Sequence, residues 1–207
     1  MQNVCTFYIV RHGQSTWNVR WLMQGQQVHP PLTTEGKKQA KALSRLLEDV
    51  HFDAIYSSDL LRAKQTAEII ALERKLEVIT TELIRERKLG KLEGQSLNLL
   101  KEFDKNRAAL SYEERRKHKE VPEMESDEEI TTRFVTFLRE TAIRNVGKTI
   151  LLVSHSGIMR PLLIHLGWAT YENFTSEKAI HNASYIKLES DGIDFFVKET
   201  YGIDKPE

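Results

Sequence analysis

The sequence predicts an α/β fold, a three-layer α/β/α sandwich around a mostly parallel central sheet. Short apolar runs rich in β-branched and aromatic residues alternate with stretches of helical periodicity along most of the chain. This alternation is typical of a parallel sheet covered by helices on both faces. The 207 residues fit one large domain that can bury a core without disulfides or metals. Because no repeat, linker or low-complexity segment divides the chain, we expect a single domain over residues 1–207.

The first half of the chain begins with a strand and continues in strand–helix alternation. Residues 4–10 form a short apolar run that predicts a central strand. Ala40 and Leu43 belong to an apolar stripe at helical spacing, which predicts a helix over 34–50. The next predicted elements are a strand at 53–57, a helix at 60–73, a third strand at 76–79 and a loop at 90–94.

A charged stretch separates the third and fourth predicted strands. Residues 97–119 are polar with helical spacing, and we expect the segment 95–121 to be a helical insertion over one rim of the sheet. Ser126 and Glu129 have the spacing of a capping box, which predicts the start of a helix. The remaining predicted elements are a strand at 149–153, a helix at 157–166 with Pro161 in about its first turn, and a C-terminal β-hairpin with strands at 184–189 and 193–199.

The composition excludes several classes of protein. Lys+Arg and Asp+Glu are both 30, so no global basic field attracts nucleic acid or an anionic membrane. Cys5 is the only cysteine, which excludes an internal disulfide and a thiolate zinc cage. The start of the chain has no basic region with a cleavage site, and no apolar stretch is long enough to span a bilayer. We therefore expect a cytoplasmic protein without a nucleic-acid or membrane partner; the sequence leaves monomer and homodimer both open.

Chemically active residues follow the predicted strand ends. Arg11 and His12 come directly after the first strand, and His155 comes directly after the fourth. Arg62 lies in the first turn of the helix after the second strand, and Glu86 follows the third strand. The carboxyl ends of strands in an open α/β sheet are where ligands bind, so these five residues are expected to meet at one rim.

This set of residues predicts phosphoryl chemistry. Arg11 and Arg62 can hold phosphoryl oxygens through charge-assisted hydrogen bonds, and the helix that follows His155 offers free N–H groups at its start. A neutral His12 is a competent nucleophile, and Glu86 can donate a proton to a leaving alkoxide. Protein cations neutralise the transferring group, so the chemistry requires no metal.

The same residues belong to a longer series of motifs that resembles the histidine phosphatase superfamily, in its phosphoglycerate-mutase-like branch. The resemblance covers nearly the whole chain and rests on Arg11-His12-Gly13-Gln14-Ser15, Trp17-Asn18, Gln24-Gly25, Pro31-Leu32-Thr33, Glu35-Gly36, Ser57-Ser58-Asp59-Leu60, Arg62-Ala63, Gln65-Thr66-Ala67, Glu86, Gly90, Leu92-Glu93-Gly94, Glu125-Ser126, Ser154-His155-Ser156-Gly157 and Arg160. His29-Pro30 stands where many members carry an acidic residue before the Pro-Leu-Thr motif.

The resemblance implies a metal-independent phosphomonoester hydrolase that acts on a small phosphorylated metabolite and needs no cofactor. It implies a covalent phosphohistidine at His12, with Arg11, Arg62 and His155 completing the phosphate pocket. Glu86 would be the general acid and then the general base. The residues expected to line the substrate side are Asn18, Gln24, Gly25, Ser156 and Gly157.

Other interpretations remain open at this point. A cofactor-dependent phosphoglycerate mutase shares every catalytic residue, although the compact region between Glu86 and His155 and the short tail favour hydrolysis. A non-catalytic phosphate-binding or interaction protein is a second alternative. A zinc site at His12, Glu86 and His155 is disfavoured because no His-Glu-x-x-His spacing occurs and two arginines are expected nearby. The basic run 115–119 lies among glutamates, which favours a solvated mixed-charge helix over a nucleic-acid site.

Overall fold

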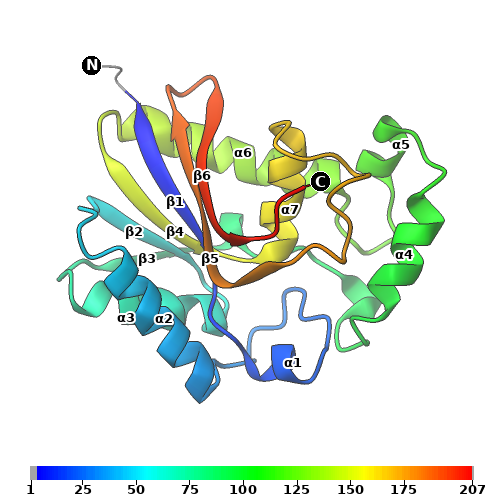
Figure 1. Cartoon of the computed structure of the whole chain (residues 1–207), viewed down its shortest axis with the longest axis horizontal. Helices are drawn as coiled ribbons and strands as arrows, with labels where there is room; N and C mark the ends of the chain where they lie inside the picture. The colour runs from blue at the N-terminus through cyan, green and yellow to red at the C-terminus, as the bar shows by residue number, and fades with distance from the viewer. Residues whose placement is uncertain (1–3, 207) are drawn as a thin grey trace.

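The computed structural model describes residues 4–206, which form a six-stranded sheet in the order β3-β2-β4-β1-β5-β6 (Figure 1). The strands are β1 (Cys5–Arg11), β2 (Ala54–Ser58), β3 (Val78–Thr81), β4 (Thr149–Ser154), β5 (Ile180–Ser190) and β6 (Phe195–Ile203). The first four strands are parallel, whereas β5 pairs antiparallel with β1 and with β6. The predicted α/β class and mostly parallel sheet are confirmed.

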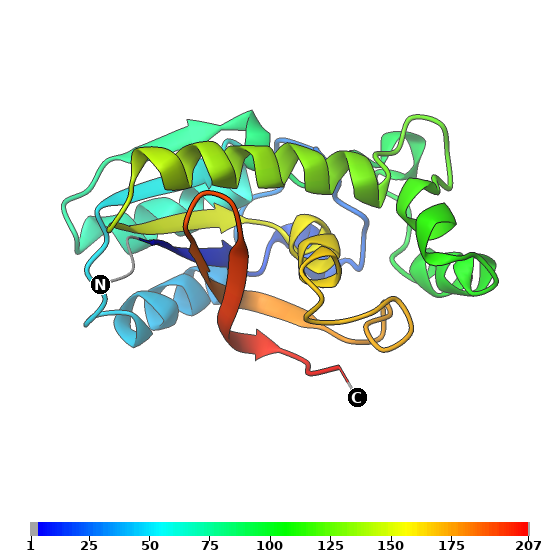
Figure 2. The ribbon, with the colours of Figure 1, turned by 90° about the horizontal axis from the view of Figure 1, so that it is seen from above.

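Helices cover both faces of this sheet. The longer helices are α2 (Thr34–Leu46), α3 (Leu61–Leu72), α6 (Asp127–Arg144) and α7 (Ser156–His165). Figure 2 shows α2 and α6 on opposite sides of the sheet. The alternation of β1 explains the two layers, because Phe7 and Ile9 pack in the core with α6 and α7, whereas Tyr8 and Val10 pack in the core with α2 and α3. No helix among residues 4–206 is long and apolar enough to cross a lipid bilayer.

The charged insertion is two helices and not one continuous stretch. α4 (Leu99–Arg107) and α5 (Tyr112–Lys117) lie to one side of the sheet in Figure 1. The expected helical insertion is present, and it is interrupted at residues 108–111. Ser111 accepts a hydrogen bond from the Glu114 N–H, and the Glu114 side chain accepts from the Ser111 N–H, so a second capping box starts α5.

Other elements differ from the sequence-based bounds. A short helix α1 (Thr16–Val19) and two 3₁₀ turns, η1 (Glu82–Ile84) and η2 (Gly90–Leu92), were not predicted; η2 stands in the predicted loop at 90–94. The predicted capping box at the start of α6 is confirmed. The hairpin is also present, and both of its strands are longer than predicted. Residues 1–3, which belong to the expected domain and to the expectation about the start of the chain, lie outside the described residues.

Pro161 lies in the second turn of α7 and not in its first. Proline has no N–H to donate to the carbonyl four residues earlier, so the Gly157 carbonyl loses its helical partner. The Arg87 guanidinium lies at 3.5 Å from this oxygen and donates to it. A side chain from another segment thus satisfies the carbonyl that the proline leaves free.

Close backbone contacts fix the loop after β1 against the start of α2. A Cβ atom built at Gly36 would overlap the Gln14 carbonyl oxygen, and one built at Gly13 would overlap the Gly36 carbonyl oxygen. The Thr33 N–H donates to the same Gln14 oxygen at 2.9 Å. The segment that carries His12 is therefore seated on α2 by contacts that only glycine permits.

We predict that Gly36→Ala lowers the free energy of unfolding by about 2 kcal/mol, because a methyl group is forced into rigid backbone. A helical Gly→Ala change usually stabilises by about 0.5–1 kcal/mol, so the expected sign is opposite to the ordinary one. Urea unfolding measures the change, with Lys38→Ala on the exposed face of the same helix as the control. Unchanged or raised stability of the Gly36 variant would show that the contact is not tight.

Candidate active site

The predicted residues meet at the carboxyl ends of β1 and β4. Arg11 pairs with Ser154 across the parallel ladder, and the His12 N–H donates to the Ser154 carbonyl at 3.0 Å. The rings of His12 and His155 are therefore neighbours, with their centroids 5.2 Å apart. A cleft of about 630 Å³ opens at this point. His12 is 2% exposed and His155 is fully buried.

The His12 ring has a defined tautomer. Its Nδ1 atom lies 2.7 Å from the Gly13 carbonyl oxygen, and a carbonyl can only accept, so Nδ1 carries the proton. The lone pair of the neutral ring is then on Nε2. The Gly13 N–H donates to the Thr66 hydroxyl at 3.1 Å, and that hydroxyl donates to the Arg62 carbonyl at 2.8 Å. The loop that orients the ring is thereby attached to α3.

Two arginines surround the histidine pair, and each has part of its guanidinium unpartnered. Arg62 lies in the first turn of α3, is fully buried, and donates to the carbonyls of Gly25 at 2.8 Å and Gln27 at 2.9 Å. Arg11 donates to the Ile180 carbonyl. Buried nitrogen atoms without a hydrogen-bond partner remain on both arginines, at Nε, and on both ring nitrogens of His155.

Unpartnered buried polar atoms are costly in a folded protein and mark a place where a ligand completes the hydrogen bonds. Arg11 and Arg62 line the cleft, the His155 ring lies beside His12, and most of the unpartnered atoms can donate. His155 therefore lacks the hydrogen bonds that a purely structural buried histidine makes. The arrangement is suited to an anion with several oxygen acceptors, such as a phosphoryl group.

The electrostatic environment keeps both rings neutral. Burial, followed by the charges of Arg62 and Arg11, holds the pKa of His12 well below its ordinary value of 6.5. Burial and the Arg62 charge lower the pKa of His155 in the same way. Burial also lowers the pKa of each of the two arginines to about 10, so both remain charged at neutral pH. A neutral imidazole beside fixed cations is the combination that phosphoryl transfer to nitrogen requires.

Glu86 is held at the edge of the cleft by backbone donors. Its carboxylate accepts from the Arg87 N–H at 2.7 Å and from the Gly157 N–H at 3.1 Å. A Cβ atom at position 157 would overlap this carboxylate, so glycine is needed there for Glu86 to reach the first turn of α7. A hydrogen bond thus links Glu86, the acid predicted from the sequence, to the segment that carries His155.

The residues expected on the substrate side also line the cleft: Asn18, Gln24, Gly25, Ser156 and Gly157. The Asn18 side-chain oxygen accepts from the Ser15 N–H at 2.9 Å, and the Gln24 side-chain oxygen accepts from the Ser15 hydroxyl at 2.8 Å. Ser15 therefore fixes both amide side chains on the side of the cleft near the short helix α1. His29, at the departure from the family motif, is exposed, and Pro30 is buried.

The structure adds cleft residues that the sequence did not identify. Arg87 pairs with Asp127, and the Tyr171 hydroxyl donates to the second Asp127 oxygen at 2.8 Å. Arg160, the last residue of the family motif series, donates to the carbonyls of Phe174, Thr175 and Lys178 and so braces the segment before β5. No local pattern identifies Asp127 as a cleft residue, because its partners lie 40 and 44 positions away along the chain.

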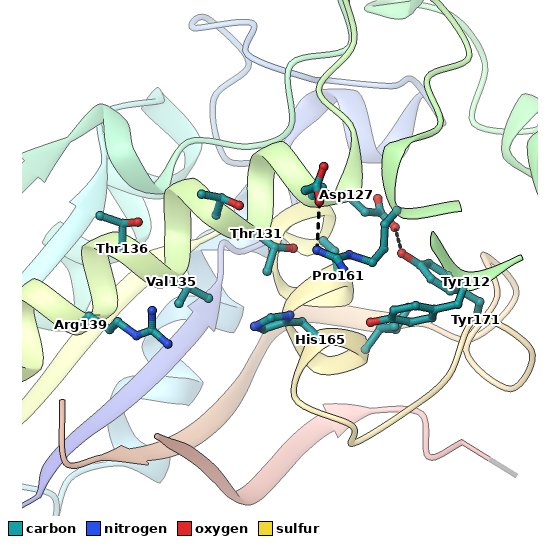
Figure 3. Close-up of a pocket in the computed structure, with 13 residues that line it drawn as sticks. Tyr112, Asp127, Thr131, Val135, Thr136, Arg139, Pro161, His165 and Tyr171 are labelled. Carbon is teal, nitrogen blue, oxygen red and sulfur yellow. Dashed lines mark hydrogen bonds and ion pairs between the residues drawn. The ribbon is translucent and has the colours of Figure 1, made fainter. Parts of the chain in front are cut away.

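A smaller pocket of about 190 Å³ lies between α6 and α7, with Asp127 and Tyr171 in its lining (Figure 3). Asp127, Pro161, Ile164 and Tyr171 line both this pocket and the main cleft. None of the sequence-predicted site residues lines it. Within residues 4–206, no group of three or more His, Cys, Asp or Glu side chains lies close enough together to hold a metal ion.

Comparison with known proteins agrees with this geometry. A family model described as the histidine phosphatase superfamily (branch 1) matches residues 7–201. The chain belongs to the histidine phosphatase superfamily. The resemblance inferred from the motifs is thereby confirmed, and the phosphoglycerate-mutase-like branch is represented among the relatives.

Relatives in this superfamily carry names of both phosphatases and mutases. The fructose-2,6-bisphosphatase TIGAR of Xenopus tropicalis is 45% identical over 97 residues, which cover 45% of this chain and 35% of that protein. The 2,3-bisphosphoglycerate-dependent phosphoglycerate mutase of Cytophaga hutchinsonii is 31% identical over 206 residues, or 90% of this chain and 95% of that protein. Among solved structures, Bacillus stearothermophilus YhfR is 30% identical with a TM-score of 0.79, covering 96% of each chain.

The neutral histidines predict a specific pH dependence of stability. In the unfolded chain a histidine takes up a proton below about pH 6.5, whereas the folded His155 does so only at much lower pH. The unfolded state then binds more protons, so stability is retained above pH 6.5 and lost as the pH falls below it. Between about pH 7.5 and 5.5, His155 alone should cost about 1.4 kcal/mol of unfolding free energy.

Urea unfolding of the wild type and of His155→Gln at the two pH values, in phosphate-free buffer, measures this contribution. The variant should lose less stability on acidification, by roughly the amount given by the proton linkage. Groups elsewhere in the chain contribute equally to both proteins and cancel. Equal losses in the two proteins would mean that His155 titrates normally in the folded state.

Proposed function

We propose that this chain is a metal-independent phosphomonoester hydrolase that works through a covalent phosphohistidine on His12. The observation that carries the proposal is the neutral His12 ring, with its lone pair on Nε2, beside buried unpartnered nitrogens of Arg11, Arg62 and His155. A phosphoryl group of the substrate would supply the missing acceptors. Membership of a superfamily with phosphatase-named relatives supports the same reaction. The substrate would be a small phosphorylated metabolite.

In the first step of the proposed reaction, the His12 Nε2 lone pair attacks phosphorus and the P–O bond to the leaving group breaks. The Arg11 and Arg62 guanidinium groups and the His155 ring hold the equatorial oxygens, where negative charge accumulates. Glu86 gives its proton to the departing oxygen, which becomes an alcohol. The Gly13 carbonyl, bonded to Nδ1–H, stabilises the positive charge that forms on the ring.

In the second step, water attacks the phosphorus opposite the His12 nitrogen. Glu86, now a carboxylate, accepts a proton from that water. The P–N bond breaks, inorganic phosphate leaves, and His12 returns to its neutral tautomer. The position of Glu86 on two backbone N–H groups, from Arg87 and Gly157, allows it to serve in both directions without a change of place.

A mutase is the second candidate, because the Cytophaga mutase matches this chain over nearly its whole length. It would use the same phosphohistidine and the same acid, with a substrate hydroxyl in place of water. The two candidates differ in one product, inorganic phosphate. A non-catalytic phosphate-binding protein is disfavoured by the presence of nucleophile, cations and acid in one cleft.

We predict that His12→Ala lowers phosphate release from phosphomonoesters by roughly 10⁴-fold or more, because the nucleophile is lost. The measurement is inorganic phosphate release from an ester panel with chelator present, with a thermal unfolding curve to show that the variant folds. Retained turnover in the variant would overturn the phosphohistidine. Interconversion of phosphoglycerate isomers without phosphate release would establish the mutase, and a chelator-sensitive activity would point to a metal.

Glu86→Gln should impair esters with poor leaving groups far more than aryl phosphates. An alkoxide needs a proton in order to leave, whereas a phenolate hardly does. We expect kcat/KM for an alkyl phosphate to fall at least tenfold more than kcat/KM for 4-nitrophenyl phosphate. Equal losses on both esters would show that Glu86 is not the general acid.

A further inference from the structure

The cleft is much larger than the phosphate pocket at its floor. Its volume of about 630 Å³ falls in the middle of the range of about 300–1,000 Å³ that accommodates drug-sized ligands. The liquid volume of a water molecule is about 30 Å³, so a phosphoryl group with a few carbon atoms leaves most of the cleft empty. The distal part of the cleft, away from Arg11, His12 and Arg62, is therefore the part that would contact the leaving group.

Apolar side chains form part of the cleft lining, and we call them the apolar wall. Its members are Leu22, Met23, Leu89, Leu97, Leu100 and Met124. They come from three segments: the loop after α1, the stretch from just before η2 into α4, and the segment before α6. The fold thus brings residues that are far apart in sequence to one cleft.

Backbone hydrogen bonds attach this apolar wall to the phosphate pocket. The Met23 N–H donates to the Gln95 carbonyl and the Gly94 N–H donates to the Met23 carbonyl, both at 2.8 Å. The next residues of the same loop supply the Gly25 and Gln27 carbonyls that hold Arg62. A leaving group attached to a phosphoryl bound at Arg62 would therefore lie against this wall.

Three arginines of the distal cleft are paired with carboxylates, which compensate their charge. Arg87 pairs with Asp127, Arg107 with Glu120 at 2.8 Å, and Arg115 with Glu172 at 3.3 Å. Arg160 donates to three backbone carbonyls, as described above. A paired cation offers much less field to a second anion. Arg11, Arg62 and Arg160 donate to backbone carbonyls, which do not compensate their charge.

We infer that the substrate is a phosphomonoester whose leaving group presents a large apolar surface, such as an aryl or long alkyl group, to the six side chains of the apolar wall. The inference rests on the proposed hydrolase function, since it assigns the rest of the same cleft. The inferred substrate differs from the bisphosphorylated compounds that appear in the names of two relatives.

A substrate comparison tests the leaving group directly. Phenyl phosphate and 2-naphthyl phosphate have leaving groups of similar acidity and differ mainly in apolar area. We expect kcat/KM to be roughly tenfold or more higher for the naphthyl ester. Fructose 2,6-bisphosphate and 3-phosphoglycerate should be poorer substrates than either aryl ester. A preference for the bisphosphate or the phosphoglycerate would overturn the inference.

Two neighbouring leucines on α4 provide a matched pair of variants. Leu100 lines the cleft, whereas Leu99 does not, and both are half-buried. Leu100→Ala should lower the naphthyl-to-phenyl ratio of kcat/KM by about five- to tenfold, and Leu99→Ala should leave that ratio unchanged. A ratio that is the same in both variants would overturn the apolar wall as the site of recognition. Because the readout is a ratio within one protein, a general loss of folded enzyme does not affect it.

The failures of the two proposals are distinguishable. If esters are hydrolysed and His12→Ala abolishes the reaction, the hydrolase function stands whatever the order of substrates. If that order favours doubly anionic substrates, only the inference about the leaving group is wrong. If no ester is hydrolysed in a His12-dependent manner, the proposed function itself has failed.

Discussion

The guanidinium groups of Arg11 and Arg62 are buried beside the rings of His12 and His155. Their Nε atoms and both ring nitrogens of His155 have no acceptor or donor in the protein. Such an arrangement is unfavourable, because desolvated charges and polar atoms lose their water without replacement. In the proposed reaction, a phosphoryl dianion relieves this cost on binding. Burial and the same cations keep the His12 ring neutral, so in this proposal ligand affinity and nucleophilicity depend on the same groups.

The surrounding fold stabilises this unfavourable arrangement with rigid backbone. The parallel pairing of β1 with β4 aligns the two histidine segments. The Gly25, Gln27 and Ile180 carbonyls accept hydrogen bonds from the two arginines. The loop after β1 lies so close to α2 that a Cβ atom at Gly36 would overlap it. The site can therefore tolerate unpartnered polar atoms because the elements that carry them have little freedom to rearrange.

The two parts of the cleft follow different physical rules. The floor is built from charge, at the ends of central strands, where burial is deepest. The apolar wall is built from side chains on α4 and on connecting segments. Three arginines of the distal cleft are paired with carboxylates. Loops and insertions accept substitution more readily than strand ends do. A superfamily that includes proteins named for several substrates is consistent with a fixed floor and a variable wall.

The sequence by itself determined the α/β class, the order of the strands and helices along the chain, and the convergence of Arg11, His12, Arg62, Glu86 and His155. These features depend on periodicity and on the rule that parallel strands present their carboxyl ends at one edge. Helix caps such as Ser126 were also readable, because capping is a local interaction. The break between α4 and α5 carried a local signal as well, at Ser111 and Glu114, which the charged composition of the stretch obscured.

Only the tertiary structure decided the rest. Asp127 pairs with Arg87 and Tyr171, and the Gly157 N–H donates to the Glu86 carboxylate. Three segments supply the apolar wall. All of these residues come together from distant parts of the chain. No local propensity encodes such contacts. Whether an arginine is paired or unpartnered depends on which segments fold around it, and this decides where the cleft can accept an anion.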